Sequence, residues 1–149
     1  MAVEAVSKFE RFFRVAAELD VDKDDLKRHR DFVTRKLADL LLIGQVAAKA
    51  NLRDVIEFWD LPITKGLQER IHEFEKLDEE IELEPILERL ATWPQLDLTL
   101  SEETVDRLPI LVGGISLALA RSFRIIDPKT KNPQTAQWER AFQLFNLLL

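Results

Sequence analysis

The sequence predicts an all-α fold, and three observations support this prediction. The chain of 149 residues has only 4 glycines and 6 prolines, and Leu, Ala, Glu, Lys and Arg are frequent, which favours helix. Apolar residues recur mostly at spacings of three and four, as on the buried face of a helix. The order of a short, a long and a further helix also occurs twice. With 46% hydrophobic residues, we expect one compact domain, 1–149, made of two halves, 1–78 and 79–149.

The first half begins with a short helix and a long one. S-K-F-E at 7–10 fits a capping box, which predicts that the short helix starts there and ends near Leu19. The long helix is expected from about Asp24 to Ala50. Its buried face is predicted to carry seven residues: Leu26, Val33, Leu37, Leu40, Leu41, Gly44 and Ala48. His29, within K-R-H-R-D, is expected on the solvated face of this helix.

The third helix of the first half is predicted to begin at Asp60, which can act as its N-cap. Pro62 would then lie in the first turn, where proline is tolerated because its missing N–H has no helical partner there. We expect this helix to run to about Leu77.

The second half repeats this order and adds a strand signal. Pro85 is expected to start a short helix over residues 85–91. L-D-L-T-L at 96–100 alternates apolar and polar residues, which predicts a short strand. Ser101 can cap a long helix that reaches about Asp127.

A loop and a last helix complete the chain. D-P-K-T-K-N-P-Q at 127–134 is rich in turn-forming residues, and Thr135 can cap the helix that follows. The ending F-Q-L-F-N-L-L-L at 142–149 is strongly apolar. It can either pack inside the domain or offer a docking surface to a second chain, and the sequence leaves both alternatives open.

The stretch N-L-R-D-V-I-E-F-W-D-L-P-I-T-K-G-L-Q-E at 51–69 resembles the second loop of a histone fold. Arg53 and Asp60 stand seven residues apart and match, in type and spacing, an arginine–aspartate pair of that loop. The whole chain is similar to a small uncharacterised family of prokaryotic proteins with two fused histone folds. The resemblance implies that Arg53 and Asp60 brace the loop as a pair. Alternatively, Asp60 is only an N-cap and Arg53 is an unrelated surface residue.

For the whole molecule, the resemblance implies a histone-fold pseudodimer, in which the two halves pack against each other in an intramolecular handshake. The long helices would cross where side chains are small, at Ala38 in one helix and at Gly113 and Gly114 in the other. The loops would pair as a short parallel bridge, with residues 55–57 against residues 98–100.

The charge distribution bears on nucleic-acid binding. The net charge is −6, and residues 78–106 hold ten acidic residues against the single Arg89. Such a protein is not drawn to nucleic acid by its overall field. The resemblance nevertheless implies that Arg11 and Arg53 contact DNA. Arg14, Lys23, Lys27 and Arg28 are further DNA-contacting candidates, because they would form one basic face with Arg11. Asp20, Asp54 and Glu57 stand where histones carry basic residues, and they would repel DNA.

Two functional hypotheses from different classes follow. The first is a protein-interaction or scaffold module that has largely lost the histone-type DNA surface. The second is a histone-like, nucleoid-associated protein that binds DNA through the basic face around Arg11, Arg14, Lys27 and Arg28. The sequence identifies no protein partner, and we expect either a monomeric pseudodimer or a homodimer.

We expect no enzyme activity, no cofactor and no metal. The chain has no cysteine, which excludes thiolate metal sites and cysteine nucleophiles. His72 follows Glu69 at the i,i+3 spacing of di-iron helical bundles, but no second such pair exists. No phosphate loop, dinucleotide fingerprint or G-x-S-x-G motif occurs. The chain start lacks signal-peptide features and the longest near-apolar run, 108–120, is short for a membrane span, so we expect a cytoplasmic protein without membrane contact.

Overall fold

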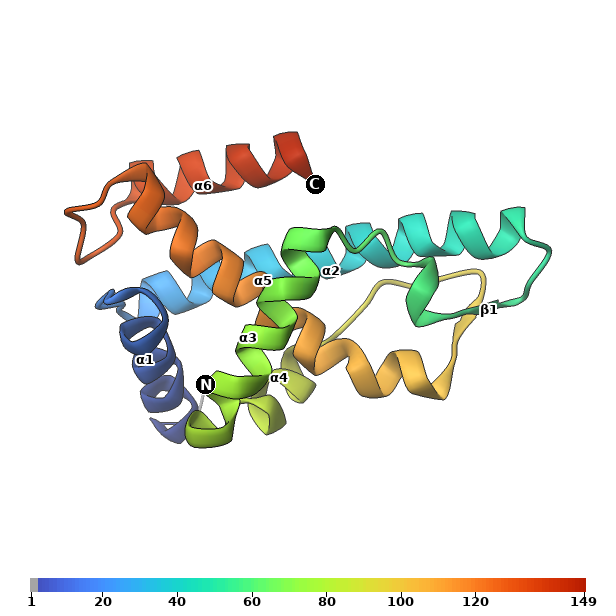
Figure 1. Cartoon of the computed structure of the whole chain (residues 1–149), viewed down its shortest axis with the longest axis horizontal. Helices are drawn as coiled ribbons and strands as arrows, with labels where there is room; N and C mark the ends of the chain where they lie inside the picture. The colour runs from blue at the N-terminus through green and yellow to red at the C-terminus, as the bar shows by residue number, and fades with distance from the viewer. Residues whose placement is uncertain (1–2) are drawn as a thin grey trace.

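Most of the chain is helical in the computed structural model, which describes residues 3–149 (Figure 1). The described residues form these helices: α1 (Val3–Ala17), α2 (Lys23–Ala50), α3 (Lys65–Ile81), α4 (Glu84–Leu90), α5 (Glu102–Ile126) and α6 (Thr135–Leu148). One turn of 3-10 helix, Phe58–Asp60, and two very short strands, β1 (Val55–Ile56) and β2 (Thr99–Leu100), lie between them. The prediction of an all-α protein is confirmed.

The two long helices, α2 and α5, cross each other, and each also supports the third helix of the opposite half. At the crossing, His29 of α2 is hydrogen-bonded to Ser116 of α5, with Nε2 and Oγ 2.8 Å apart. α3 packs along α5 (Figure 1). α6 lies over α2, where the rings of Phe32 and Phe142 stack with their centroids 5.0 Å apart. The packing of the two halves is therefore reciprocal.

The connecting loops pair in the same reciprocal way. β1 and β2 form a parallel bridge in which Val55 is opposite Thr99 and Ile56 is opposite Leu100. The predicted bridge between 55–57 and 98–100 is thereby confirmed. At the other end of the molecule, the backbone N–H of Asp20 donates to the carbonyl of Lys131 over 2.7 Å. Each loop of the first half thus meets a loop of the second.

One hydrophobic core runs through both halves. Phe12 of α1 packs edge-on against Phe74 of α3, with the ring centroids 6.0 Å apart. Phe123 of α5 packs edge-on against Trp138 of α6, with the centroids 4.7 Å apart. All four side chains are almost completely buried. Phe12 and Phe74 belong to the first half and Phe123 and Trp138 to the second, and all four are part of one continuous cluster of buried residues.

The predicted start of α1 is wrong. α1 begins by Val3, so Ser7 lies inside the helix and caps nothing. Ala5 is buried and Val6 packs partly against the core, so the apolar face extends about one turn ahead of the predicted capping box.

The predicted cap of α3 is also wrong. Asp60 ends the 3-10 turn, and α3 begins at Lys65 after Thr64, whose hydroxyl accepts a hydrogen bond from the N–H of Leu67 over 3.2 Å. The physical reason is that Pro62 disfavours helical geometry at the residue before it, and Leu61 is indeed extended.

The end of α3 and the start of α6 also differ from the predicted positions. α3 continues to Ile81, which is buried, and so passes its predicted end near Leu77. The N-cap of α6 is Gln134 and not Thr135, because Gln134 and Gln137 form a reciprocal capping box. The predicted helix itself is present in both places.

The small residues predicted at the crossing of the long helices have other partners. A Cβ on Gly113 would overlap the ring of Phe74, and one on Gly114 would lie 2.5 Å from Ile71. Both glycines therefore allow α3, and not α2 as predicted, to approach α5. Ala38 is half-buried and lines a surface hollow. The crossing prediction was wrong because α3, a helix the sequence argument left out of the crossing, fills that position.

Helix α5 is by length and composition apolar enough to cross a membrane, although the sequence argument excluded a span. Of its most apolar 18-residue window, 61% is buried inside the protein. Packing against α1, α3, α4 and α6 accounts for this composition.

Candidate functional site

Arg53 and Asp60 form an ion pair at the β1 end of the molecule. The guanidinium Nη1 of Arg53 donates to Oδ2 of Asp60 over 2.6 Å, and Nη2 donates to Oδ1. The same carboxylate accepts the backbone N–H of Glu57 over 2.8 Å. The hydrogen bonds from Arg53 hold the pKa of the Asp60 carboxyl below its usual value. The guanidinium of Arg53 is therefore hydrogen-bonded within the loop, and it holds in place the segment that carries β1.

The surface around this pair combines acidic and apolar side chains. Asp54 is exposed, and Lys49 is paired with Asp97, with Nζ and Oδ2 2.6 Å apart. Leu52 is 96% exposed and Trp59 is 69% exposed. Arg53 is thus surrounded by acidic groups, which would repel phosphates, and by apolar groups, which would not attract them.

The remaining DNA-contacting candidates lie at the opposite end of α2. Lys23 and Lys27 are exposed one turn apart at the start of α2, and Arg11 and Arg14 are exposed on α1. Since α2 rises about 1.5 Å per residue, its two ends are about 40 Å apart. The structure therefore does not bring Arg53 together with the other candidates.

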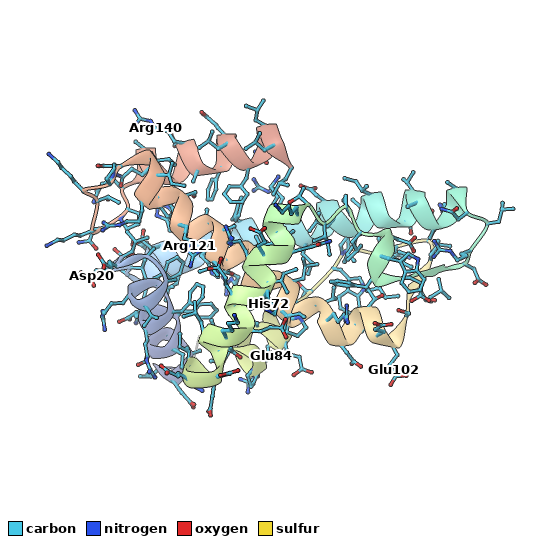
Figure 2. The ribbon with its side chains drawn as sticks, viewed as in Figure 1. Asp20, His72, Glu84, Glu102, Arg121 and Arg140 are labelled. Atoms are coloured by element: carbon cyan, nitrogen blue, oxygen red, sulfur yellow. The ribbon has the colours of Figure 1, made fainter. Side chains whose placement is uncertain are left out.

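Two of these candidates have partners inside the chain. The Nε of Arg14 lies 3.7 Å from a carboxylate oxygen of Asp20, the acidic residue of the first loop (Figure 2). The Nη2 of Arg28 donates to the hydroxyl of Thr135 over 2.9 Å. Arg11, Lys23 and Lys27 form no ion pair within residues 3–149.

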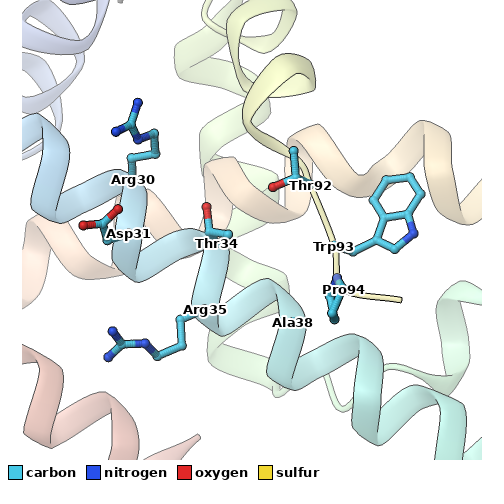
Figure 3. A pocket seen from close by; sticks show the side chains of 8 residues that line it. All are labelled: Arg30, Asp31, Thr34, Arg35, Ala38, Thr92, Trp93 and Pro94. Atoms are coloured by element: carbon cyan, nitrogen blue, oxygen red, sulfur yellow. The ribbon is translucent and has the colours of Figure 1, made fainter. Parts of the chain in front are cut away.

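Three residues outside the predicted DNA-contacting set lie on this side of α2. Arg30 and Arg35 are exposed, and with Trp93 they line an open hollow of about 700 Å³ (Figure 3). The spacing of Lys23, Lys27 and Arg30 by four and three residues could have indicated one basic helix face. Nothing in the sequence indicates that Trp93, more than fifty residues away, lies beside it.

His29 is the clearest error of the sequence argument, because it is buried and not solvated. The Ser116 hydroxyl gives its hydrogen to the carbonyl of Val112, so Nε2 of His29 must donate to Oγ of Ser116. The rings of Phe9 and Phe13 pack edge-on against the imidazole. Burial lowers the pKa of His29 to about 3, so the side chain is neutral and structural.

A second buried polar pair joins the two halves. The indole Nε1 of Trp138 donates to Oδ1 of Asp25 over 2.8 Å. The other carboxylate oxygen of Asp25 accepts the N–H of Asp22 over 3.0 Å, which completes the capping box of α2. Burial raises the pKa of the Asp25 carboxyl. This pair fixes the start of α6 on the start of α2.

The residues considered for metal binding stay apart. His72 is exposed on α3, and Glu69 is bonded to Arg70 and Lys65 (Figure 2). Within residues 3–149, no three or more His, Asp or Glu side chains gather in a way that could hold a metal ion.

The apolar C-terminus is partly buried. Phe142 and Phe145 pack against Phe32, whereas Leu147 and Leu148 are 80% and 74% exposed. The first part of the ending therefore packs inside the domain, as one of the two alternatives expected.

The surface has two further apolar features. A groove of about 500 Å³ runs between α3, α5 and α6. On the outer face of α2, three large apolar residues are exposed close together: Leu42, Ile43 and Val46.

Comparison with known proteins adds a family and a fold. The family described as "Domain of unknown function (DUF1931)" matches residues 9–146. A crystal structure of a protein from Thermus thermophilus is 52% identical, superposes with a TM-score of 0.86 and is covered over 97% of both chains.

Two matches come from Aquifex aeolicus. The crystal structure of protein AQ328 is 23% identical, with a TM-score of 0.84 over 97% of this chain and 95% of that chain, and it shares the fold. A protein of strain VF5 described as uncharacterized is 26% identical over 110 residues, which are 74% of this chain and 64%, less than two thirds, of that protein.

Proposed function

The chain belongs to the DUF1931 family, and from this premise we propose that it is a double histone-fold protein that serves as a protein-interaction scaffold. The proposal has two parts. The first concerns the fold, a histone-fold pseudodimer, and the second concerns the use of its surface.

The reciprocal packing supports the histone-fold part. A strip of three helices with one long member cannot cover its own apolar face, so it needs a partner. Here α3 packs on α5 and α6 lies over α2, so each half covers the other. The loops meet in the same exchanged order, through β1 and β2 at one end and through Asp20 and Lys131 at the other. This exchange of helices and loops is what a handshake of two fused histone folds requires.

The observation that carries the scaffold part is the apolar surface that remains after this packing is complete. Leu42, Ile43 and Val46 on α2, and Leu147 and Leu148 on α6, are all more than 40% exposed. Contiguous apolar groups on a folded surface mark sites of protein contact. The occupant is either a second copy, which would give a homodimer, or another protein.

The second candidate function, histone-like DNA binding, is favoured by Arg11, Lys23 and Lys27, which are exposed and free of ion pairs within residues 3–149. Two observations oppose it. Arg53 is bonded to Asp60 and lies at the other end of α2, and Asp54 is exposed beside it. A duplex long enough to touch both ends would therefore meet acidic groups.

The remaining expectations are part of the proposal. The protein acts without catalysis, cofactor or metal, in the cytoplasm and away from membranes. The side chains best suited to such chemistry support this, since His29 is buried and bonded to Ser116 and His72 has no second carboxylate–histidine pair facing it within residues 3–149.

Fluorescence anisotropy of a labelled duplex of about 60 base pairs, at about 50 and about 200 mM salt, tests the proposal. A scaffold leaves the duplex free at both salt concentrations. Submicromolar binding that collapses at the higher salt, and that is abolished in an Arg11→Glu, Arg14→Glu variant, would overturn the scaffold role in favour of DNA binding. A Lys65→Glu, Lys76→Glu variant, with the same change in net charge on α3, is the matched control.

A further inference from the structure

One face of α2 carries cations that have no acidic partner. Lys23, Lys27, Arg30 and Arg35 are all exposed, and none forms an ion pair within residues 3–149. Their neighbours on α1 and α2 are different: Lys8, Arg14, Lys36 and Lys49 each lie within 4 Å of a carboxylate. The charge of these four side chains is therefore available to a ligand, and we call them, with Thr34, the α2 stripe.

The α2 stripe follows the helix axis. Lys23, Lys27, Arg30 and Thr34 are spaced by four, three and four residues, which places them on one face. Arg35 points about 100° away from Thr34 around the helix axis, and it lines the larger hollow from the side. Lys23, Lys27 and Arg30 surround a hollow of about 220 Å³, and Arg30 also lines the larger hollow of about 700 Å³. The two hollows thus meet at Arg30 and extend from Lys23 to Ala38, over about 22 Å of helix.

An aromatic side chain stands at the far end of this surface. Trp93, on the segment between α4 and β2, is 42% exposed. Figure 3 shows the Arg30 and Arg35 side chains on one side of Thr34 and the Trp93 indole on the other. The segment is held beside α2 because Oε1 of Gln45 accepts the backbone N–H groups of Asp97 and Leu98 over 2.7 and 3.1 Å.

We propose that the α2 stripe and Trp93 together bind single-stranded nucleic acid, with phosphates against the four cations and a base stacked on the indole. Surfaces that bind single strands without sequence preference combine a cationic track with an aromatic platform. Asp31 lines the larger hollow together with Arg30 and Arg35, and Asp24 is exposed on the same helix. These two carboxylates offset two of the four positive charges, so the surface keeps a net positive charge.

A single strand fits this surface better than a duplex. The indole can stack only on a base that is not already paired and stacked, and a flexible strand can follow one helix face. A stiff duplex would reach beyond the face, toward acidic residues such as Asp20 and Asp54, which are both exposed. This proposal does not depend on the scaffold role.

Fluorescence anisotropy with a labelled oligothymidylate of about 12 nucleotides tests it on the full-length protein. The wild type binds at about 50 mM salt and more weakly at about 200 mM. An Arg30→Gln, Arg35→Gln variant lowers the slope of log affinity against log salt by about 1.4, because each phosphate contact contributes about 0.7 on a single strand. Lys65→Gln with Lys76→Gln, on α3, matches its net charge and leaves the slope unchanged.

The aromatic contact has its own control. Trp93→Ala lowers the affinity at least about fivefold, whereas Trp59→Ala, which removes an exposed tryptophan from another part of the surface, does not. Trp93→Phe restores part of the affinity, because a phenyl ring still stacks. Far-UV circular dichroism confirms that each variant is folded.

Three results would overturn the proposal. These are an oligonucleotide that stays free at about 50 mM salt, equal losses for Trp93→Ala and Trp59→Ala, and an unlabelled duplex that competes as well as an unlabelled single strand.

Discussion

At the scale of single residues, His29 couples the stability of the fold to pH. Its imidazole lies between Phe9 and Phe13 and donates to Ser116. The pKa of His29 is about 3 in the folded protein and 6.5 in its ordinary, solvated state. Below pH 6.5, His29 therefore binds a proton in the unfolded chain but stays neutral in the folded protein.

The folded protein should lose stability as the pH falls below 6.5. The stabilisation from a neutral His29 is complete above pH 6.5 and is lost as the pH falls toward 3, by about 1.4 kcal/mol per pH unit in the middle of this range. Thermal unfolding followed by circular dichroism should show Tm falling from pH 6.5 to pH 4. His29→Gln should lower Tm at neutral pH but flatten this dependence, whereas His72→Gln, at an exposed site, should keep it. An unchanged pH dependence in His29→Gln would contradict this account.

Residue identity and spacing could reveal some pairs and not others. The contact between Arg53 and Asp60 is implied by the resemblance of their loop to that of a histone fold, and the structure contains it. His29 is surrounded in sequence by charged residues, and only the position of α1 and α5 shows that it faces inward. The link between Asp25 and Trp138 spans more than a hundred residues and left no local signal.

At the scale of elements, the contact between α3 and α5 rests on two adjacent glycines. A Cβ on Gly114 would lie 3.0 Å from the backbone nitrogen of Ile71 and 2.5 Å from its Cγ1. A backbone atom cannot move aside by a rotamer change, as a flexible side chain can. The helices would have to move apart to accept any larger residue there.

Gly114→Ala should therefore destabilise the protein. Overpacking should lower the free energy of unfolding by about 1–3 kcal/mol, and the higher helix propensity of alanine should offset about 1 kcal/mol of this loss. Gly66→Ala is the matched control, because it lies in the first turn of α3 and a Cβ there would meet only Oγ1 of Thr64, 4.0 Å away. Gly66→Ala should leave the free energy of unfolding unchanged or raise it by up to about 1 kcal/mol. Urea unfolding of the two variants measures both changes, and equal stabilities would contradict the role given to Gly114.

Helices were easier to predict than their ends. The three- and four-residue spacing located the long helices, because it reflects burial of a whole face, whereas Pro85 indicated the short helix α4. The ends depend on single hydrogen bonds that several residues could make. Thr64, and not Asp60, caps α3 because the Asp60 carboxylate is bonded to Arg53 and the N–H of Glu57. That competition between partners is invisible in a list of capping residues.

At the scale of the whole molecule, neither half has a complete core. Phe74 of the first half packs over Gly113 of the second, and Phe142 of the second packs on Phe32 of the first. The sequence suggested that two halves would pair, but it assigned the close contact to the wrong helix. Spacing identifies which face of a helix is buried, and it does not identify which element covers that face.

Fragments 1–82 and 83–149, which divide the chain at the left-handed residue that ends α3, should each be largely unfolded alone. Mixed in equal amounts, they should regain helix, because each supplies the surface that the other lacks. Far-UV circular dichroism measures this recovery, and it should rise with concentration as for any bimolecular association. Fragment 1–82 with full helicity on its own would contradict the shared core.

The covalent connection between the halves also removes symmetry. In a dimer of identical chains, every substitution appears on both sides of the axis. Here Lys23, Lys27 and Arg30 stand on α2 alone, and the ten acidic residues of 78–106 run from the end of α3 into the start of α5. The basic surface of α2 therefore occurs once per molecule. A ligand held on it would bind one to one and in a single orientation.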